Sequence, residues 1–175
     1  MPKSALHRFL DRELLALTLS ATAQRSDLYA SDLTEAERRP FQRSLRESLQ
    51  RVTGSYKRSV TGSAHLENIQ SLAAHLSKAH SQVLASGQMK IGHAQKALNL
   101  YLKYLWCLNQ VQEPPHFPID SIILKKVPGF TTFRWTRMES IDEYTAIIEA
   151  AHRQAKEQRL SLARWELKEY KRRDA

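Results

Sequence analysis

Apolar residues recur at helical spacing along most of this 175-residue chain, and only the short run Ile122–Leu124 has the composition of a strand. Serine, threonine or aspartate precedes most of the periodic segments, where its side chain can accept a hydrogen bond from the free amides of a first helical turn. Glycine and proline separate the segments. The pattern predicts an all-α fold of about seven or eight helices, with residues 1–175 forming a single domain.

The predicted helix starts are local signals that can be read one by one. Thr34 and Ser140 each stand three residues before a glutamate, which is the spacing of a capping box. The segment from Leu66 to Val83 is expected to form a helix that ends at Ser86-Gly87. The other predicted caps and the apolar faces that follow them are Ser4 with Leu6, Leu10, Leu14 and Leu17, and Leu15 as a further candidate; Thr34 with Phe41, Leu45, Leu49 and Val52; Asp120 with Ser121–Val127; Ser140 with Tyr144, Ile147, Ile148 and Ala151; and Ser161 with Leu162, Trp165 and Tyr170.

The segment Ala94–Leu108 is the most apolar of the predicted helices. Its apolar residues lie on most of the helical circumference, so we expect it to be the central, buried helix. Cys107, the lone cysteine, falls at a core position of this helix and is predicted to be a buried thiol in a reducing compartment. The apolar runs are too short to span a bilayer, and the N-terminus lacks the apolar stretch of a secretory signal. We therefore expect a cytoplasmic protein without membrane contact.

The formal net charge of +9 favours a polyanionic partner. The excess is concentrated between Arg38 and Arg58, where seven cationic residues accompany a single acidic residue, Glu47. We predict phosphate contacts for four of the seven and keep a solvated helix face as the alternative. The four are Arg38, Arg39, Arg43 and Arg46. A second basic group near the C-terminus is diluted by acidic residues, among them Glu166.

Aromatic residues alternate with arginines from Phe130 to Arg137, a pattern that nucleic-acid-binding surfaces use. We predict that Arg134 and Arg137 contact a nucleic acid. The alternative is that Phe133 and Trp135 anchor a loop to the core.

Motifs for metals and cofactors are missing from the sequence. The seven histidines are scattered, and no cysteine cluster has the spacing of a metal site. No glycine-rich phosphate loop and no G-x-S-x-G motif is present. The sequence predicts neither a metal site nor a cofactor.

The stretch from Ile91 to Asp120 carries the most specific motif. Gly92 precedes the apolar helix, Lys96 and Asn99 stand in its first turns, and Pro118-Ile119-Asp120 follows a proline-rich loop and opens the next apolar segment. In this order the residues resemble the helix-hairpin-helix superfamily of DNA glycosylases, which includes endonuclease III and the archaeal 8-oxoguanine glycosylases. That family places a glycine hairpin before a helix of the form Lys-x-Ala-Asn-apolar-apolar, and an apolar-Asp pair begins its next helix. Here the lysine is followed directly by Ala97, and two glycines of the region, Gly87 and Gly92, are five residues apart.

The resemblance implies that the chain extrudes a damaged or modified base from double-stranded DNA and cleaves its N-glycosidic bond. Asp120 would stabilise the positive charge that develops on the sugar, and Lys96 could attack C1′ to give lyase activity. We expect DNA contacts from Lys90, Gly92 and His93, and a base pocket that includes Asn99, His116 and Phe117. The protein is expected to act as a monomer, in base-excision repair or in defence against phage with modified DNA.

Three alternatives stay open at this point. Asp120 can be an ordinary helix cap, and Lys96 a surface lysine with a partly buried stem. The chain can also be a non-catalytic basic helical module that binds DNA or RNA through its arginines. A ribonuclease of the HEPN type, built on the pattern Arg58-x6-His65, is the least favoured interpretation, because Thr61-Gly62-Ser63 interrupts the helix between the two residues.

Overall fold

The computed structural model describes residues 4–24 and 26–171, and within these ranges the chain forms seven α-helices and two short 3-10 helices. The all-α prediction is confirmed, since the described residues contain no strand and only one isolated bridge, between Tyr29 and Leu84. The elements in chain order are α1 (Ala5–Ala23), α2 (Glu35–Thr53), η1 (Gly54–Lys57), α3 (Gly62–His80), α4 (Ile91–Cys107), α5 (Ser121–Leu124), η2 (Trp135–Arg137), α6 (Ile141–Glu157) and α7 (Leu162–Glu169).

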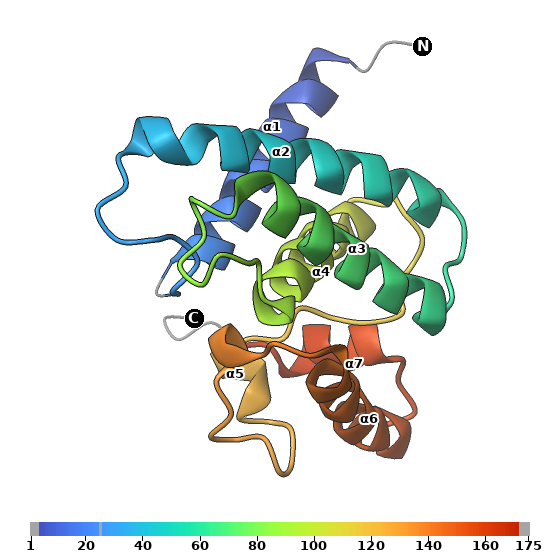
Figure 1. Ribbon diagram of the computed structural model, residues 1–175. Helices are drawn as coiled ribbons and strands as arrows, with labels where there is room; N and C mark the ends of the chain where they lie inside the picture. Colours follow the sequence, from blue (N-terminus) through green and yellow to red (C-terminus); the bar gives the residue numbers. More distant parts are fainter. Residues whose placement is uncertain (1–3, 25, 172–175) are drawn as a thin grey trace.

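The helices pack around α4, which contacts α1, α2, α3, α6 and η2. Figure 1 shows α2 along one edge of the molecule, α6 and α7 at the opposite edge, and α5 on the same side of α4 as α7. Every residue from Ile91 to Leu102 is buried, so the first three turns of α4 have no solvent-facing side. The prediction of a central, buried helix is therefore confirmed, and its polar side chains must find partners inside the protein.

The predicted caps are formed as the sequence indicated. The side chains of Ser4, Thr34, Asp120, Ser140 and Ser161 each accept a hydrogen bond from a backbone amide of the helix that follows. Both capping boxes, Thr34 with Glu37 and Ser140 with Glu143, are complete. None of the helices in the described ranges combines the length and the apolarity that a bilayer crossing requires.

Three predicted helix boundaries are wrong. The helix predicted to reach Ser86-Gly87 ends at His80, because the chain turns there to bury Leu84 and to pair Ala30 and Ala85 with backbone groups of the opposite segment. The helix predicted over Ser121–Val127 ends at Leu124, and a turn closed by the Val127 amide follows it. The central helix begins at Ile91, one turn before the predicted Ala94.

The apolar face predicted for α1 is also wrong in part. Leu6 and Leu17 are 64% and 53% exposed, whereas Leu15 of the predicted face is buried together with the polar residues Asp11 and Thr18. The cause is a polar contact from a distant element, since Asp11 accepts hydrogen bonds from Tyr101 of α4 and Gln50 of α2.

Cys107 corrects a second prediction about the core. It stands at the last residue of α4 and its side chain is exposed rather than buried. The helix leaves the core after Leu105, so the helical spacing that predicted a buried thiol no longer applies at its end.

Candidate active site

Lys96 and Asp120 meet inside the protein. The Nζ atom of Lys96, in the second turn of α4, donates to Oδ2 of Asp120 at 2.7 Å. The other carboxylate oxygen, Oδ1, accepts the amides of Ile122 (2.9 Å) and Ile123 (3.0 Å) and thereby caps α5. The side chains are only 6% and 12% exposed. Asp120 is therefore a helix cap and an ion-pair partner at once, and the alternative of Lys96 as a surface lysine is wrong.

Gln95, the neighbour of Lys96, fixes the backbone next to Asp120. Its Nε2 donates to the Ile119 carbonyl (2.8 Å), and its Oε1 accepts the Ile119 amide (3.0 Å). Both polar groups of one residue are thus bound by one side chain, as a neighbouring strand would bind them. Gln95 is not among the residues predicted for the site. The feature of the sequence that could indicate it is a polar side chain within a helix that is apolar on most of its circumference.

Asn99 extends this contact into a buried hydrogen-bond chain. Its Nδ2 lies 3.3 Å from Oε1 of Gln95 and 3.0 Å from the Tyr144 hydroxyl on α6. The hydroxyl of Tyr144 in turn contacts Nδ1 of His116 at 3.0 Å. The loop that leads into Asp120 is therefore held at His116 and at Ile119. Asn99 and His116, predicted to line a base pocket, are buried members of this chain.

A second tyrosine–histidine contact lies beside the first. The hydroxyl of Tyr56 contacts Nδ1 of His65 at 2.6 Å and accepts a hydrogen bond from Asn68 at 3.0 Å. The rings of His65 and His116 meet edge to face, with centroids 4.8 Å apart.

Both histidines are neutral at pH 7. Burial lowers the pKa of His65 to about 3, with the neighbouring His116 as the second cause, and burial alone lowers the pKa of His116 to about 4. Burial also raises the pKa of Tyr56 to about 12 and that of Tyr144 well above its usual range. Since Tyr56 accepts from Asn68 and Tyr144 accepts from Asn99, each hydroxyl proton is available to its histidine Nδ1. In that arrangement both histidines carry their own proton on Nε2.

Two turns along α4 a second ion pair is buried. Nζ of Lys103 contacts both carboxylate oxygens of Glu166 on α7 at 2.8 Å, and it lies 4.5 Å from the centre of the Tyr170 ring. Glu166 is only 1% exposed, and burial raises its pKa, while Lys103 opposes the shift and Asp120 adds to it. This pair is not predicted from the sequence, in which Glu166 stands as an acidic residue of a basic C-terminal group.

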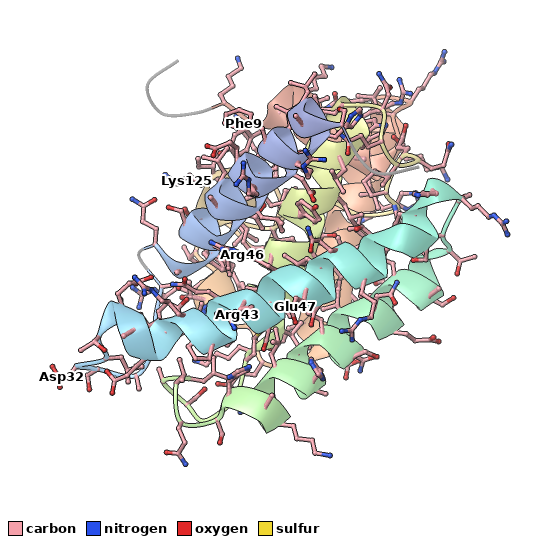
Figure 2. All side chains as sticks on the ribbon, turned by 90° about the horizontal axis from the view of Figure 1, so that it is seen from above. Phe9, Asp32, Arg43, Arg46, Glu47 and Lys125 are labelled. Carbon is pink, nitrogen blue, oxygen red and sulfur yellow. The ribbon has the colours of Figure 1, made fainter. Side chains whose placement is uncertain are left out.

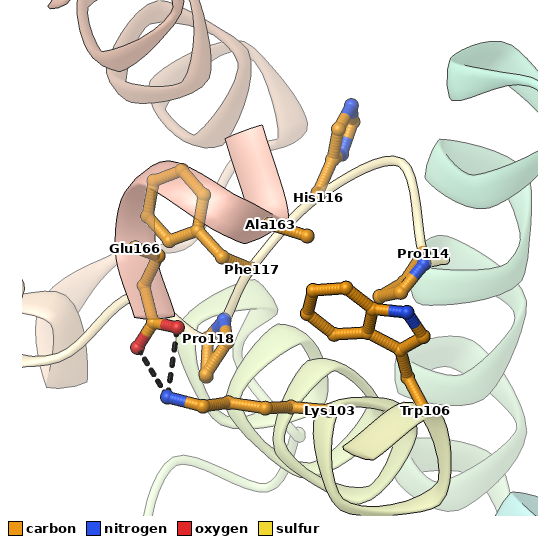
Figure 3. Close-up of a pocket in the computed structure, with 8 residues that line it drawn as sticks. All are labelled: Lys103, Trp106, Pro114, His116, Phe117, Pro118, Ala163 and Glu166. Carbon is orange, nitrogen blue, oxygen red and sulfur yellow. Dashed lines mark hydrogen bonds and ion pairs between the residues drawn. The ribbon is translucent and has the colours of Figure 1, made fainter. Parts of the chain in front are cut away.

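Figure 3 shows this second pair at the edge of a narrow hollow that is partly open to solvent and too tight to hold a water molecule. Phe117 and Pro118 line it from the loop that enters Asp120, and His116 points away from the ion pair. The ring of Phe117 is fully buried and packs against Trp165 at 5.5 Å between centroids. Phe117, predicted to line a base pocket, is thus a core residue at the wall of this hollow.

The residues predicted to bind DNA at the start of α4 are engaged within the protein. The Gly92 amide donates to the Met138 carbonyl (2.9 Å), and a Cβ at this position would lie 1.9 Å from the Trp135 carbonyl oxygen. His93 is buried against Trp135, and burial lowers its pKa to about 4. Lys90 lies 3.3 Å from a carboxylate oxygen of Asp27 and 3.8 Å from one of Glu139. In this conformation none of the three presents an exposed, unpaired donor to a phosphate.

The predicted arginines divide into exposed and partly buried side chains. Arg39, Arg43 and Arg46 are exposed on α2, and Figure 2 shows Arg43 and Arg46 on the upper face of the molecule beside Glu47. Arg38 is half-buried, with its guanidinium 5.0 Å from the centre of the Tyr29 ring. Arg134 and Arg137 are exposed on either side of the buried Trp135.

The HEPN pattern is not assembled on one exposed face. Arg58 is exposed and ends the η1 turn, whereas His65 lies one turn inside α3 and is fully buried. Thr61 caps α3 between them, so the two residues belong to different elements.

The described residues contain no group of three or more histidine, cysteine, aspartate or glutamate side chains that could hold a metal ion. Comparisons of the chain with protein-family models, with curated proteins and with solved structures found no match.

Proposed function

We propose that the protein is a DNA glycosylase whose chemical residues are Asp120 and Lys96. The observation that carries the proposal is their buried ion pair, which joins residues 24 positions apart in the order that the resemblance implies. A carboxylate fixed by two backbone amides and an amine within hydrogen-bonding distance are the groups that cleavage of an N-glycosidic bond requires.

In the hydrolytic reaction the C1′–N bond breaks and positive charge develops on the sugar. Asp120 stabilises that charge and orients a water molecule toward C1′, and the leaving base takes up a proton. In the lyase reaction Lys96 first passes a proton to Asp120, and its amine attacks C1′ while the C1′–N bond breaks and the base leaves with a proton. The sugar ring opens to a Schiff base, and loss of a C2′ proton with cleavage of the C3′–O bond releases the 3′-phosphate. The target base stays open between damaged and phage-modified bases, and so does the role in repair or in defence.

The burial of the pair sets a condition on this reaction. With side chains only 6% and 12% exposed, Lys96 and Asp120 can be reached by a flipped nucleotide only if the segments around them move. The net charge of +9 fits a phosphate backbone, and the choice of double-stranded DNA as the partner follows from the resemblance.

The test is incubation of the protein with duplexes that carry a panel of damaged and phage-modified bases, followed by alkali to reveal abasic sites. We expect strand cleavage at one class of base, and loss of cleavage with Asp120→Asn. Trapping with borohydride tests the lyase reaction, since a covalent complex should form with the natural chain and not with Lys96→Met.

A non-catalytic nucleic-acid-binding module is the second candidate. It is favoured by the fact that both oxygens of Asp120 have structural partners and that Arg39, Arg43 and Arg46 are exposed. If no base in the panel is released, while duplex binding is retained by Asp120→Ala and Lys96→Ala, this second function replaces the glycosylase.

A further inference from the structure

The segment from Ser121 to Met138 is the most one-sidedly charged stretch near the candidate active site. It contains Lys125, Lys126, Arg134 and Arg137 and no acidic residue. All four side chains are exposed. Across residues 4–24 and 26–171, none of the four takes part in an ion pair or a side-chain hydrogen bond.

Three lysines in or next to α4 are paired with carboxylates. Lys96, Lys103 and Lys90 each lie against a carboxylate, at 2.7, 2.8 and 3.3 Å. The four exposed cations of the segment, in contrast, remain available to an outside anion. Free phosphates of a nucleic acid are the natural partner for such charges.

Both ends of the segment are attached to the elements that carry the ion pair. Its first residue follows Asp120 directly, and its last residue, Met138, accepts the Gly92 amide in the first turn of α4. The close approach of the Trp135 carbonyl to Gly92 adds to this second attachment. The cations therefore stand on a loop that leaves from Asp120 and returns about one turn before Lys96.

The framework that carries the cations is fixed by burial and by successive turns. The same segment carries five buried apolar residues, which are Ile123, Leu124, Val127, Trp135 and Met138. The amides of residues 130, 133 and 137 each bond the carbonyl three residues earlier, at 3.1, 3.0 and 2.9 Å. A preformed scaffold lowers the entropy cost of holding charged side chains against a ligand.

We propose that Lys125, Lys126, Arg134 and Arg137 bind the phosphate backbone of double-stranded DNA next to the nucleotide presented to Asp120. The location relative to the nucleotide and the choice of double-stranded DNA rest on the proposed function, whereas a partner rich in phosphate follows from the unpaired charge. The arginines of α2 lie at the other edge of the molecule from α5, α6 and α7 (Figure 1), so they cannot provide the contacts closest to Asp120.

The experiment measures binding of the full chain to a duplex oligonucleotide with a stable abasic-site analogue, by fluorescence anisotropy over a series of salt concentrations. The test variant replaces Lys125, Lys126, Arg134 and Arg137 by glutamine. The matched control makes the same charge change at four exposed cations for which no nucleic-acid contact is predicted, Lys78, Arg153, Lys156 and Arg159. Circular dichroism and thermal unfolding verify that both variants are folded.

We expect the salt dependence of log Kd to fall by roughly three to four in the test variant, since each phosphate contact contributes about 0.9 to that slope. The control should lose less than about one unit of slope, and each single substitution of the test set should lose about one. Equal losses in the two variants, a larger loss in the control, or no binding by the natural chain would each overturn the inference.

The readout separates this inference from the proposed function. Binding to the analogue needs no bond cleavage, so a natural chain that binds through these four residues but releases no base retains the inference and loses the glycosylase. Conversely, base release that is unchanged in the test variant, together with unchanged binding, retains the glycosylase and removes the inference.

Discussion

Two lysine–carboxylate pairs lie two turns apart on α4, and their contacts look alike. Lys96 meets Asp120 at 2.7 Å and Lys103 meets Glu166 at 2.8 Å, and all four side chains are at most 12% exposed. Residues two turns apart share one side of a helix. The two pairs also influence each other, since Asp120 and Lys96 both act on the pKa of Glu166.

The difference between the pairs lies in what else holds the carboxylate. Asp120 accepts two backbone amides at the start of α5 in addition to Lys96, and negative charge is favoured at that position. Glu166 is buried to 1% exposure and has Lys103 as its cationic partner, and its pKa is raised by burial. We infer that Lys103–Glu166 holds α7 against α4, whereas Asp120 keeps its two backbone amide bonds when Lys96 moves toward a substrate.

The largest expected effect concerns catalysis under the proposed function. Asp120→Asn keeps the helix cap but removes the negative charge, and we expect single-turnover base release to fall by about 10³-fold. Glu166→Gln removes the charge of the other pair and should change the rate by less than about tenfold. Comparable losses in the two variants would contradict the assignment of chemistry to the first pair alone.

For the free energy of unfolding we expect the reverse order, with the larger loss when the Lys103–Glu166 pair is broken. Lys103→Met leaves Glu166 without a cationic partner at an almost fully buried position, and we expect a loss of about 3–5 kcal/mol in the free energy of unfolding. Lys96→Met should lose clearly less, because Asp120 keeps its two amide bonds and has more solvent contact. Urea unfolding at pH 7 measures both. A larger loss for Lys96→Met would mean that the first pair is the structural one.

The sequence predicts those parts of this comparison that depend on neighbouring residues. Asp120 as a cap follows from its place before Ser121, and the Thr34–Glu37 box closes within one helical turn. The order of Lys96 and Asp120 around a proline-rich loop is likewise visible in the chain. Such signals need only local geometry, which is why the caps were predicted correctly.

The remaining parts depend on contacts between distant elements. Glu166 is buried because α7 packs on Lys103, which stands 63 residues earlier, and Asp11 turns α1 inward because Tyr101 lies opposite it, 90 residues later. In the sequence Gln95 is indistinguishable from other polar helix residues. Its role follows only from its two hydrogen bonds to the backbone of Ile119, 24 residues later. Periodicity assigns faces by apolar residues and cannot predict a buried polar partner.

Gln95→Leu tests whether the hydrogen bonds between Gln95 and the Ile119 backbone position Asp120. The substitution leaves both polar groups of Ile119 without their partner, at a typical cost of about 1–3 kcal/mol for a buried group. Under the proposed function we expect kcat to fall by roughly 10- to 100-fold with little change in KM, because Asp120 loses its alignment with Lys96. Gln70→Leu, at an exposed position of α3, is the control. An unchanged kcat, whatever the change in KM, would remove Gln95 as a positioning residue.

The smallest expected effect is the contribution of Glu166 to the pH dependence of the free energy of unfolding. Its folded-state pKa is raised, so its contribution to stability is fully present below the ordinary glutamate value of 4.5 and is lost as the pH rises through the folded value. The free energy of unfolding of the natural chain minus that of Glu166→Gln should therefore decrease above pH 4.5, by at most about 1.4 kcal/mol per pH unit.

His65 and His116 change the free energy of unfolding with pH in the opposite direction to Glu166, so their effect must be separated from that of Glu166. Their pKa values are lowered to about 3 and about 4, so their contribution is present above 6.5 and is lost as the pH falls toward 4. Both histidines remain in Glu166→Gln and cancel in the difference between the two proteins. A difference that is constant with pH would show that Lys103 fully compensates the burial of Glu166, and the two pairs of α4 would then be electrostatically equivalent.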